Sequence, residues 1–153
     1  MPSSESFPSD NVVELSLAPD LSALSVLARA IEDFGAACAL PEDLQGRLNL
    51  VLDELVTNSV SYGLPEVAEP ELRLRLAVDR DTVVAQLEDN GPAFNPFEEA
   101  PEPDLSLDLS DRPIGGLGVF LAKQLADSSS YERVGGRNRI TVRHLIGGKS
   151  DGD

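Results

Sequence analysis

Apolar residues recur along this chain with two different periods. From position 11 to 17 they alternate with polar residues, which predicts a short, half-buried strand. Two longer stretches then carry apolar residues three and four positions apart, the period of an amphipathic helix. They predict helices over 21–34 and 41–63, with Gly35 ending the first and Pro41 opening the second.

Apolar and polar residues alternate again after the second predicted helix. The stretches 71–78 and 82–87 flank an Asp-Arg-Asp turn, which predicts a hairpin. A third amphipathic helix is predicted over 117–126, and a second hairpin over 129–145 with its turn at Gly135–Gly136. This order of elements predicts an α/β two-layer sandwich, in which helices cover one face of a mostly antiparallel mixed sheet.

The chain of 153 residues is expected to form one domain, because that length suits a single hydrophobic core. The polar ends, 1–10 and 147–153, are expected to be flexible tails, which leaves 11–146 as the domain. Between 92 and 113 lie five prolines and six acidic residues with little periodicity. A loop of this length inside a compact domain is usually functional, so 92–114 is interpreted as a lid over a ligand.

The net charge of the chain limits the classes of partner that it can bind. The chain has 12 basic and 27 acidic residues, a formal net charge of -15, which disfavours nucleic acid and anionic membrane surfaces as partners. No signal-peptide pattern and no apolar run of membrane-spanning length is present. Cys38 is the single cysteine, so a disulfide within the chain is excluded and a cytoplasmic location is expected.

The first candidate for chemistry is a polar pair on the second helix. Glu54 and Asn58 are four residues apart, so they share one face of the helix. Asn58 falls on the shoulder of the apolar stripe, where a buried carboxamide needs a partner. The alternative is an ordinary solvated helix edge.

The second candidate follows the first hairpin directly. Asp89 offers a carboxylate acceptor to an exocyclic amine, and Gly91, which lacks a Cβ, would let a planar base lie close to the backbone. Phe94 and Asn95 would wall the same pocket. Since Asp, Asn, Gly and Pro are also the commonest turn formers, a plain turn remains the alternative.

The third candidate is the Gly-Gly-Leu-Gly run at 115–118. A glycine-rich helix entrance exposes unpaired N–H groups, which form an anion site; a lid hinge is the alternative. His144, the single histidine, has no motif for a catalytic triad or metal centre in line with it, and is interpreted as structural or exposed.

Taken in order, these motifs resemble the GHKL (histidine-kinase-like) ATPase superfamily. Glu54–Gly63 is similar to its N-box, Asp89–Pro96 to its first glycine box and Gly115–Ala122 to its second. Within the superfamily the chain resembles the anti-sigma regulatory factors of the RsbW type, which are serine-protein kinases. The resemblance implies the Bergerat, or histidine-kinase-like, ATPase fold.

The resemblance also implies roles for single residues. Asn58 would bind Mg²⁺, and Glu54 would act as general base toward the attacking hydroxyl. Asp89 would accept a hydrogen bond from the adenine amino group of ATP, with Gly91 and Phe94 in the same pocket. Thr141 would make a second contact to the base through water.

Further roles are implied along the third helix and the lid. The entrance formed by Gly116, Leu117 and Gly118 would hold phosphate oxygens through its N–H groups. Arg112, the one basic residue in the lid, would stabilise the charge of the transferred phosphoryl group.

The activity implied is that of an ATP-dependent serine/threonine protein kinase in a partner-switching system. It would phosphorylate a small STAS-type anti-anti-sigma antagonist and sequester a sigma factor or other regulatory target, and it would form a homodimer as relatives commonly do. One alternative is a non-catalytic module that uses bound nucleotide only to shape a protein-binding surface. A further alternative is a domain that binds no nucleotide.

Overall fold

The computed structural model describes residues 12–99 and 124–147. In chain order the elements are β1 (Val13–Leu17), α1 (Ala23–Cys38), α2 (Glu42–Asn58), the π-helical turn η1 (Ser59–Gly63), the 3-10 turn η2 (Leu64–Glu66), β2 (Leu72–Asp79), β3 (Thr82–Asp89), the short α3 (Pro96–Glu99), β4 (Ser128–Val134) and β5 (Arg137–Leu145). None of the described helices is both long enough and apolar enough to cross a bilayer.

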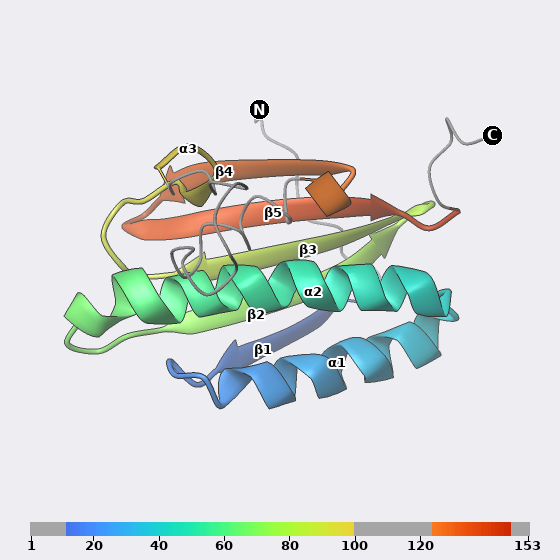
Figure 1. The fold of residues 1–153 in the computed structure, drawn as a ribbon, viewed down its shortest axis with the longest axis horizontal. Coiled ribbons are helices and arrows are strands. Elements are labelled where there is room, and N and C mark those ends of the chain that lie inside the picture. Colours follow the sequence, from blue (N-terminus) through green and yellow to red (C-terminus); the bar gives the residue numbers. More distant parts are fainter. Residues whose placement is uncertain (1–11, 100–123, 148–153) are drawn as a thin grey trace, which may run out of the picture.

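The five strands form one sheet in the order β1-β2-β3-β5-β4, and every neighbouring pair is antiparallel. Helices α1 and α2 lie side by side over one face of this sheet (Figure 1). The predicted two-layer α/β sandwich is therefore confirmed. Because β5 pairs with β3, the last strand of the chain lies beside the strand that carries Asp89.

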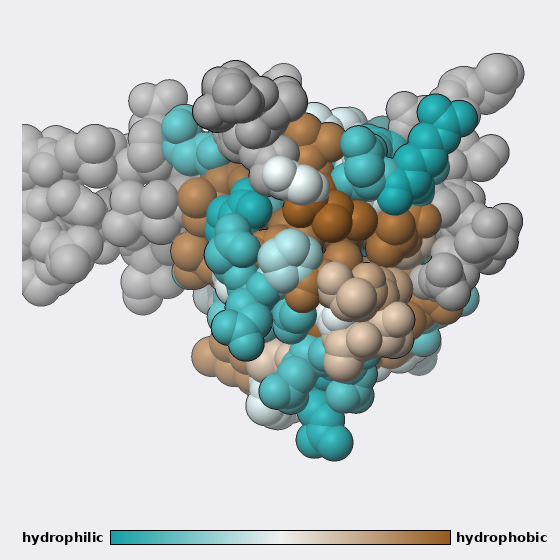
Figure 2. Space-filling model, turned by 90° about the vertical axis from the view of Figure 1, so that its right-hand side faces the viewer, coloured by the Kyte–Doolittle hydropathy of each residue, from teal (hydrophilic) through white to brown (hydrophobic). Residues whose placement is uncertain are grey.

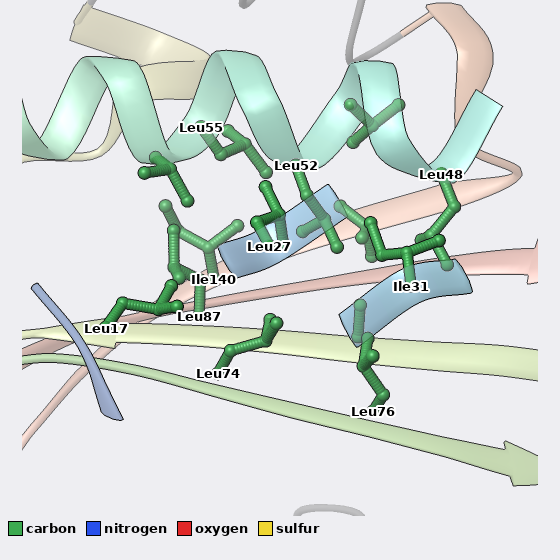
Figure 3. Close-up of a cluster of buried hydrophobic side chains, with 14 of the residues drawn as sticks. Leu17, Leu27, Ile31, Leu48, Leu52, Leu55, Leu74, Leu76, Leu87 and Ile140 are labelled. Carbon is green, nitrogen blue, oxygen red and sulfur yellow. The ribbon is translucent and has the colours of Figure 1, made fainter. Parts of the chain in front are cut away.

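The core lies between the helices and the sheet. Side chains from α1 and α2 meet alternate residues of the strands, and Figure 3 shows leucines of α2 pointing toward those of β2 and β3. The largest fully buried side chains are mostly leucines, namely Leu27, Leu44, Leu48, Leu52, Leu55, Leu72, Leu74, Leu76 and Leu87. The period-2 strands and period-3.6 helices thus place their apolar positions in one layer.

The first helix is longer than predicted. Gly35 was expected to end it, but α1 continues to Cys38 and ends at Ala39, whose φ is 56°. Gly35 is buried inside the helix, and a Cβ there would lie 2.3 Å from the side-chain carbon Cδ of Gln45 in α2. Its missing side chain therefore serves close packing between the two helices instead of helix termination.

Both predicted hairpins are confirmed. The β2–β3 turn contains Arg80 with φ 62°, and the β4–β5 turn contains Gly135 and Gly136 with φ of 56° and 78°. Two consecutive residues with positive φ suit the right-handed twist of the flanking strands, and glycine adopts that conformation without strain.

Several expectations fall wholly or largely outside the described residues. They are the two tails, most of the lid predicted over 92–114, and most of the helix predicted over 117–126, of which residues 124 and 125 are described as helical. Arg112, Gly116, Leu117 and Gly118 all belong to this part of the chain.

Candidate functional site

The end of α2 presents the predicted polar pair. Asn58 is 5% exposed and is the last residue of the α-helix, while Glu54, one turn earlier, is half-buried. Gln45 faces α1, because its side chain packs against Gly35. Glu54 comes nine residues after Gln45, about 180° further around the axis, so it points away from α1. The solvated-edge alternative does not describe Asn58, which is buried.

The carboxylate of Asp89 is the centre of a hydrogen-bond network. Asp89 is 6% exposed. Its Oδ2 accepts from Ser59 Oγ at 2.8 Å, and its Oδ1 accepts from the Gly91 N–H and from Asn138 Nδ2, both at 2.9 Å. Three segments therefore hold this one carboxylate: the end of α2, the loop after β3 and the start of β5. They meet at the left-hand end of the sandwich in Figure 1.

Ser59 and Asn138 are partners that the sequence interpretation missed. Asn138 occupies a position of β5 that alternates with the buried Ile140 and Val142. A polar residue at an apolar position of a strand is the same signal that singled out Asn58, so it could have identified Asn138. Ser59 directly follows Asn58 and continues the helical backbone, with its N–H bonded to the Leu55 carbonyl, but only the tertiary structure shows that its hydroxyl reaches Asp89.

The strand register corrects the prediction for Thr141. Asp89 is paired with Asn138, and Thr141 is paired with Gln86. Paired residues of antiparallel strands point to the same face, and faces alternate along a strand. Thr141 therefore lies on the face opposite Asp89, where its Oγ1 accepts from Gln86 Nε2 at 3.3 Å, and it is not part of the site.

The loop after β3 packs tightly against the end of η1. A Cβ on Gly91 would lie 3.2 Å from Asp89 Oδ1 and 3.3 Å from the Cα of Gly63. The chain itself therefore occupies the direction of the missing side chain, which gives this glycine a packing reason; the expected close approach by a planar base stays a prediction. Phe94, expected to wall the pocket, is half-buried, and its N–H donates to Asn138 Oδ1 at 3.1 Å.

The basic side chain of Arg133 contacts the loop that follows Asp89, while Arg137, at the same end of the sheet, pairs with Glu71. The Nη1 of Arg133, in β4, donates to the Gly91 carbonyl at 2.8 Å and to Asn138 Oδ1 at 3.2 Å. It therefore supports the loop that follows Asp89. The predicted cation, Arg112, and the predicted phosphate-binding residues Gly116, Leu117 and Gly118 lie outside the described residues.

The donor set allows a test of Mg²⁺ against the residues present. Within residues 12–99 and 124–147 no cluster of three or more His, Cys, Asp or Glu side chains could hold a metal ion. Asn58 and Glu54 offer hard oxygen donors on adjacent turns of α2. Mg²⁺ prefers such oxygens and usually binds through one or two protein groups plus substrate phosphates, so this donor set fits Mg²⁺.

Two of the ionisable groups with shifted pKa values outside the network, Asp53 and His144, are partly or fully buried. Burial, with a smaller effect of the neighbouring Glu54, raises the pKa of Asp53. His144 is fully buried near the far end of β5, and burial, together with the positive charge of Arg47, lowers its pKa to about 4 against the smaller opposing effect of Asp127. Of the two readings left open for His144, the structural one is confirmed. Figure 2 shows this end of the molecule, where hydrophobic residues lie among hydrophilic ones.

Comparison with known proteins identifies relatives of this chain. Residues 17–144 match the family described as the histidine kinase-like ATPase domain. The serine/threonine-protein kinase BtrW of Bordetella bronchiseptica is 32% identical over 99 residues, which cover 65% of this chain and 69% of that protein.

Solved structures show the same fold. The RsbU and RsbW domains of a Mycobacterium tuberculosis protein align with a TM-score of 0.64 at 14% identity, over 88% of this chain and 32% of that one. The histidine kinase domain of a blue-light activated kinase from Erythrobacter litoralis aligns with a TM-score of 0.53 at 19% identity, over 83% and 61%. This chain thus spans about a third and about three fifths of those two solved chains.

Proposed function

The chain belongs to the histidine kinase-like ATPase domain family, and from that premise we propose that it is an ATP-dependent serine/threonine protein kinase. The buried carboxylate of Asp89 is the observation that carries the proposal. A carboxylate offers about four acceptor sites, and Ser59, Gly91 and Asn138 use three of them. The remaining site, on Oδ2, suits one ligand N–H, such as the exocyclic amine of adenine.

Glu54 is proposed as the general base. Its carboxylate would accept the proton of a serine or threonine hydroxyl while that oxygen attacks the γ-phosphorus of ATP and ADP leaves. Two features support this role. The side chain of Glu54 points away from α1, and it lies within two helical turns of the buried Asn58 and of the contact between Ser59 and Asp89.

Asn58, with Glu54 beside it, would hold Mg²⁺. When bound, the ion would supply charge neutralisation on the phosphate oxygens. The N–H groups of Gly116, Leu117 and Gly118 remain the proposed phosphate donors, and Arg112 the proposed cation for the transferred group.

The proposed protein substrate is a small STAS-type anti-anti-sigma antagonist. Two similarities support a partner-switching role: the sequence similarity to the kinase BtrW, and the shared fold with a solved structure that contains an RsbW domain. In that role phosphorylation releases the antagonist, and the kinase then binds a sigma factor or other regulatory target. A cytoplasmic homodimer is the proposed working form.

A nucleotide-binding module without catalysis is the second candidate. It would need Asp89 and its partners, but not a general base at position 54. The half-buried carboxylate of Glu54 on the same side of α2 as Asn58 favours the kinase.

The experiment that separates these functions is a transfer assay. The protein is incubated with ATP, Mg²⁺ and the STAS-type antagonist from its own genome, and the antagonist is analysed by mass for phosphoserine or phosphothreonine. The kinase predicts a phosphorylated antagonist. ATP binding without any transfer would leave the module, and absence of ATP binding would remove both.

A further inference from the structure

The carboxamide of Asn138 joins the base-recognition carboxylate to the loop that follows β3. Asn138 is buried at the start of β5. Its Nδ2 donates to Asp89 Oδ1 and to the Pro92 carbonyl, both at 2.9 Å, and its Oδ1 accepts the N–H of Phe94 at 3.1 Å. One side chain therefore fixes both the carboxylate and the chain leading to Phe94.

Two side chains of β4 hold Asn138 in turn. The hydroxyl of Tyr131 donates to Asn138 Oδ1 at 2.6 Å, and Arg133 Nη1 donates to the same oxygen at 3.2 Å and to the Gly91 carbonyl at 2.8 Å. Tyr131 and Arg133 lie on the same face of the sheet as Asn138, because Arg133 is its cross-strand partner and Tyr131 lies two residues away.

The surroundings permit only one orientation of this carboxamide. The guanidinium of Arg133 and the N–H of Phe94 can only donate, whereas the ionised carboxylate of Asp89 and the carbonyl of Pro92 can only accept. If the amide were flipped, its NH₂ group would face the donors Arg133 and Phe94, and its oxygen would face the acceptor oxygens of Asp89 and Pro92. Asn138 therefore always presents an N–H to Asp89.

We propose that Asn138 is a positioning residue for base recognition, held by Tyr131 and Arg133, which keeps one acceptor site on Asp89 Oδ2 available to a 6-aminopurine. This inference rests on the proposed binding of ATP at Asp89. By occupying Oδ1, Asn138 fixes the rotation of the carboxyl group. The remaining acceptor site on Oδ2 then accepts an N–H from the ligand and repels the carbonyl oxygen of a 6-oxopurine. Binding energy at a site built to accept a hydrogen bond is lost when the ligand lacks the donor.

The test is the ratio of the dissociation constants of ITP and ATP, which share a triphosphate and differ at purine position 6. The unmodified chain should bind ATP at least about 10-fold more tightly than ITP. Asn138→Asp, which replaces the donor facing Asp89 by an acceptor, should weaken ATP binding by about 10-fold or more and bring the ratio close to about 1.

Two further variants keep the test decisive. Tyr131→Phe removes one support of Asn138 and should lower the ratio about 3-fold, with little change in unfolding temperature; it carries the test if Asn138→Asp does not fold. The control Gln86→Glu adds the same charge on the opposite face of the sheet and should keep the ratio of the unmodified chain.

The outcomes separate the inference from the proposed function. A purely structural Asn138 would weaken ATP and ITP equally, so an unchanged ratio in Asn138→Asp or Tyr131→Phe, with ATP still preferred by the unmodified chain, would overturn the positioning role alone. Failure of the unmodified chain to bind ATP would overturn the proposed function and this inference with it.

Discussion

Gly63 and Gly91 lie backbone against backbone, and this contact closes the site between the end of η1 and the loop after β3. A Cβ on Gly91 would lie 3.3 Å from both the Cα and the carbonyl carbon of Gly63 and 3.2 Å from Asp89 Oδ1. A Cβ on Gly63 would make only an ordinary contact, 4.0 Å from the Cα of Gly91, so this close approach of two motifs demands glycine at position 91.

Gly91→Ala should destabilise the protein and weaken ATP binding. The added methyl group meets backbone atoms, which move only with the whole loop, and the carboxylate that is proposed to contact adenine. We expect a loss of about 1–3 kcal/mol in the free energy of unfolding, measured by urea denaturation, and a parallel rise in the dissociation constant of ATP.

Gly46→Ala is the matched control for that change. Gly46 lies inside α2, and a Cβ there would have no atom within 4 Å. Because alanine is the better helix former, this variant should gain about 0.5–1 kcal/mol. If both glycine variants changed stability alike, the close contact of Gly91 with Gly63 would not be the cause.

Ser59→Ala should weaken ATP binding with the fold retained. The substitution removes the one described protein donor to Asp89 Oδ2, so this oxygen loses its restraint while Gly91 and Asn138 still hold Oδ1. A cost of about 1–2 kcal/mol in the free energy of unfolding is expected, together with a several-fold weaker ATP complex measured by calorimetry. Unchanged ATP affinity would show that Ser59 has no part in orienting Asp89.

Glu54→Gln should bind ATP and fail to transfer phosphate. Glutamine keeps the size of the side chain but cannot take the proton of the attacking hydroxyl, so the rate of transfer should fall by at least about 100-fold. The measurement is the initial rate of antagonist phosphorylation at saturating ATP. Full activity in this variant would remove Glu54 as the base.

Asp53→Asn is the control for Glu54→Gln. Asp53 is the adjacent carboxylate, but it comes eight residues after Gln45, about 80° around the axis, and so lies toward α1. Burial raises its pKa, so a neutral amide is well tolerated there. This variant should phosphorylate the antagonist at the rate of the unmodified chain. If its rate fell as far as that of Glu54→Gln, the effect would come from the loss of a negative charge on the helix and not from the loss of a base.

The buried His144 should make stability depend on pH. Its pKa is lowered to about 4 in the fold, against 6.5 as its ordinary value, so between these values the unfolded chain binds a proton that the folded chain does not. The free energy of unfolding therefore falls as pH drops through this window, by about 2 kcal/mol between about pH 7.5 and about pH 5.

His144→Leu removes that contribution. Neither ring nitrogen of His144 has a hydrogen-bond partner within the described part of the chain, so an apolar side chain loses no bond there. Urea unfolding of both proteins at the two pH values is the measurement. Equal pH dependence in the two proteins would mean that His144 titrates normally in the fold.

Local patterns were sufficient for much of the fold. Strand alternation and helix period predicted both helices, both hairpins and the two-layer arrangement, because burying one face of each element imposes that period on the sequence. The predicted end of the first helix at Gly35 was wrong for a non-local reason. This glycine allows close packing against Gln45, which belongs to another helix, instead of ending its own helix.

The sequence by itself singled out two candidates for chemistry: Asn58, a polar residue on the shoulder of an apolar stripe, and Asp89, which directly follows the first hairpin. Only the tertiary structure decided their partners. Strand register placed Asn138 beside Asp89 and turned Thr141 to the opposite face, and the approach of the end of α2 to the end of β3 brought Ser59 to the same carboxylate. Pairing register and close approach depend on contacts between distant segments, which the period of a single segment does not specify.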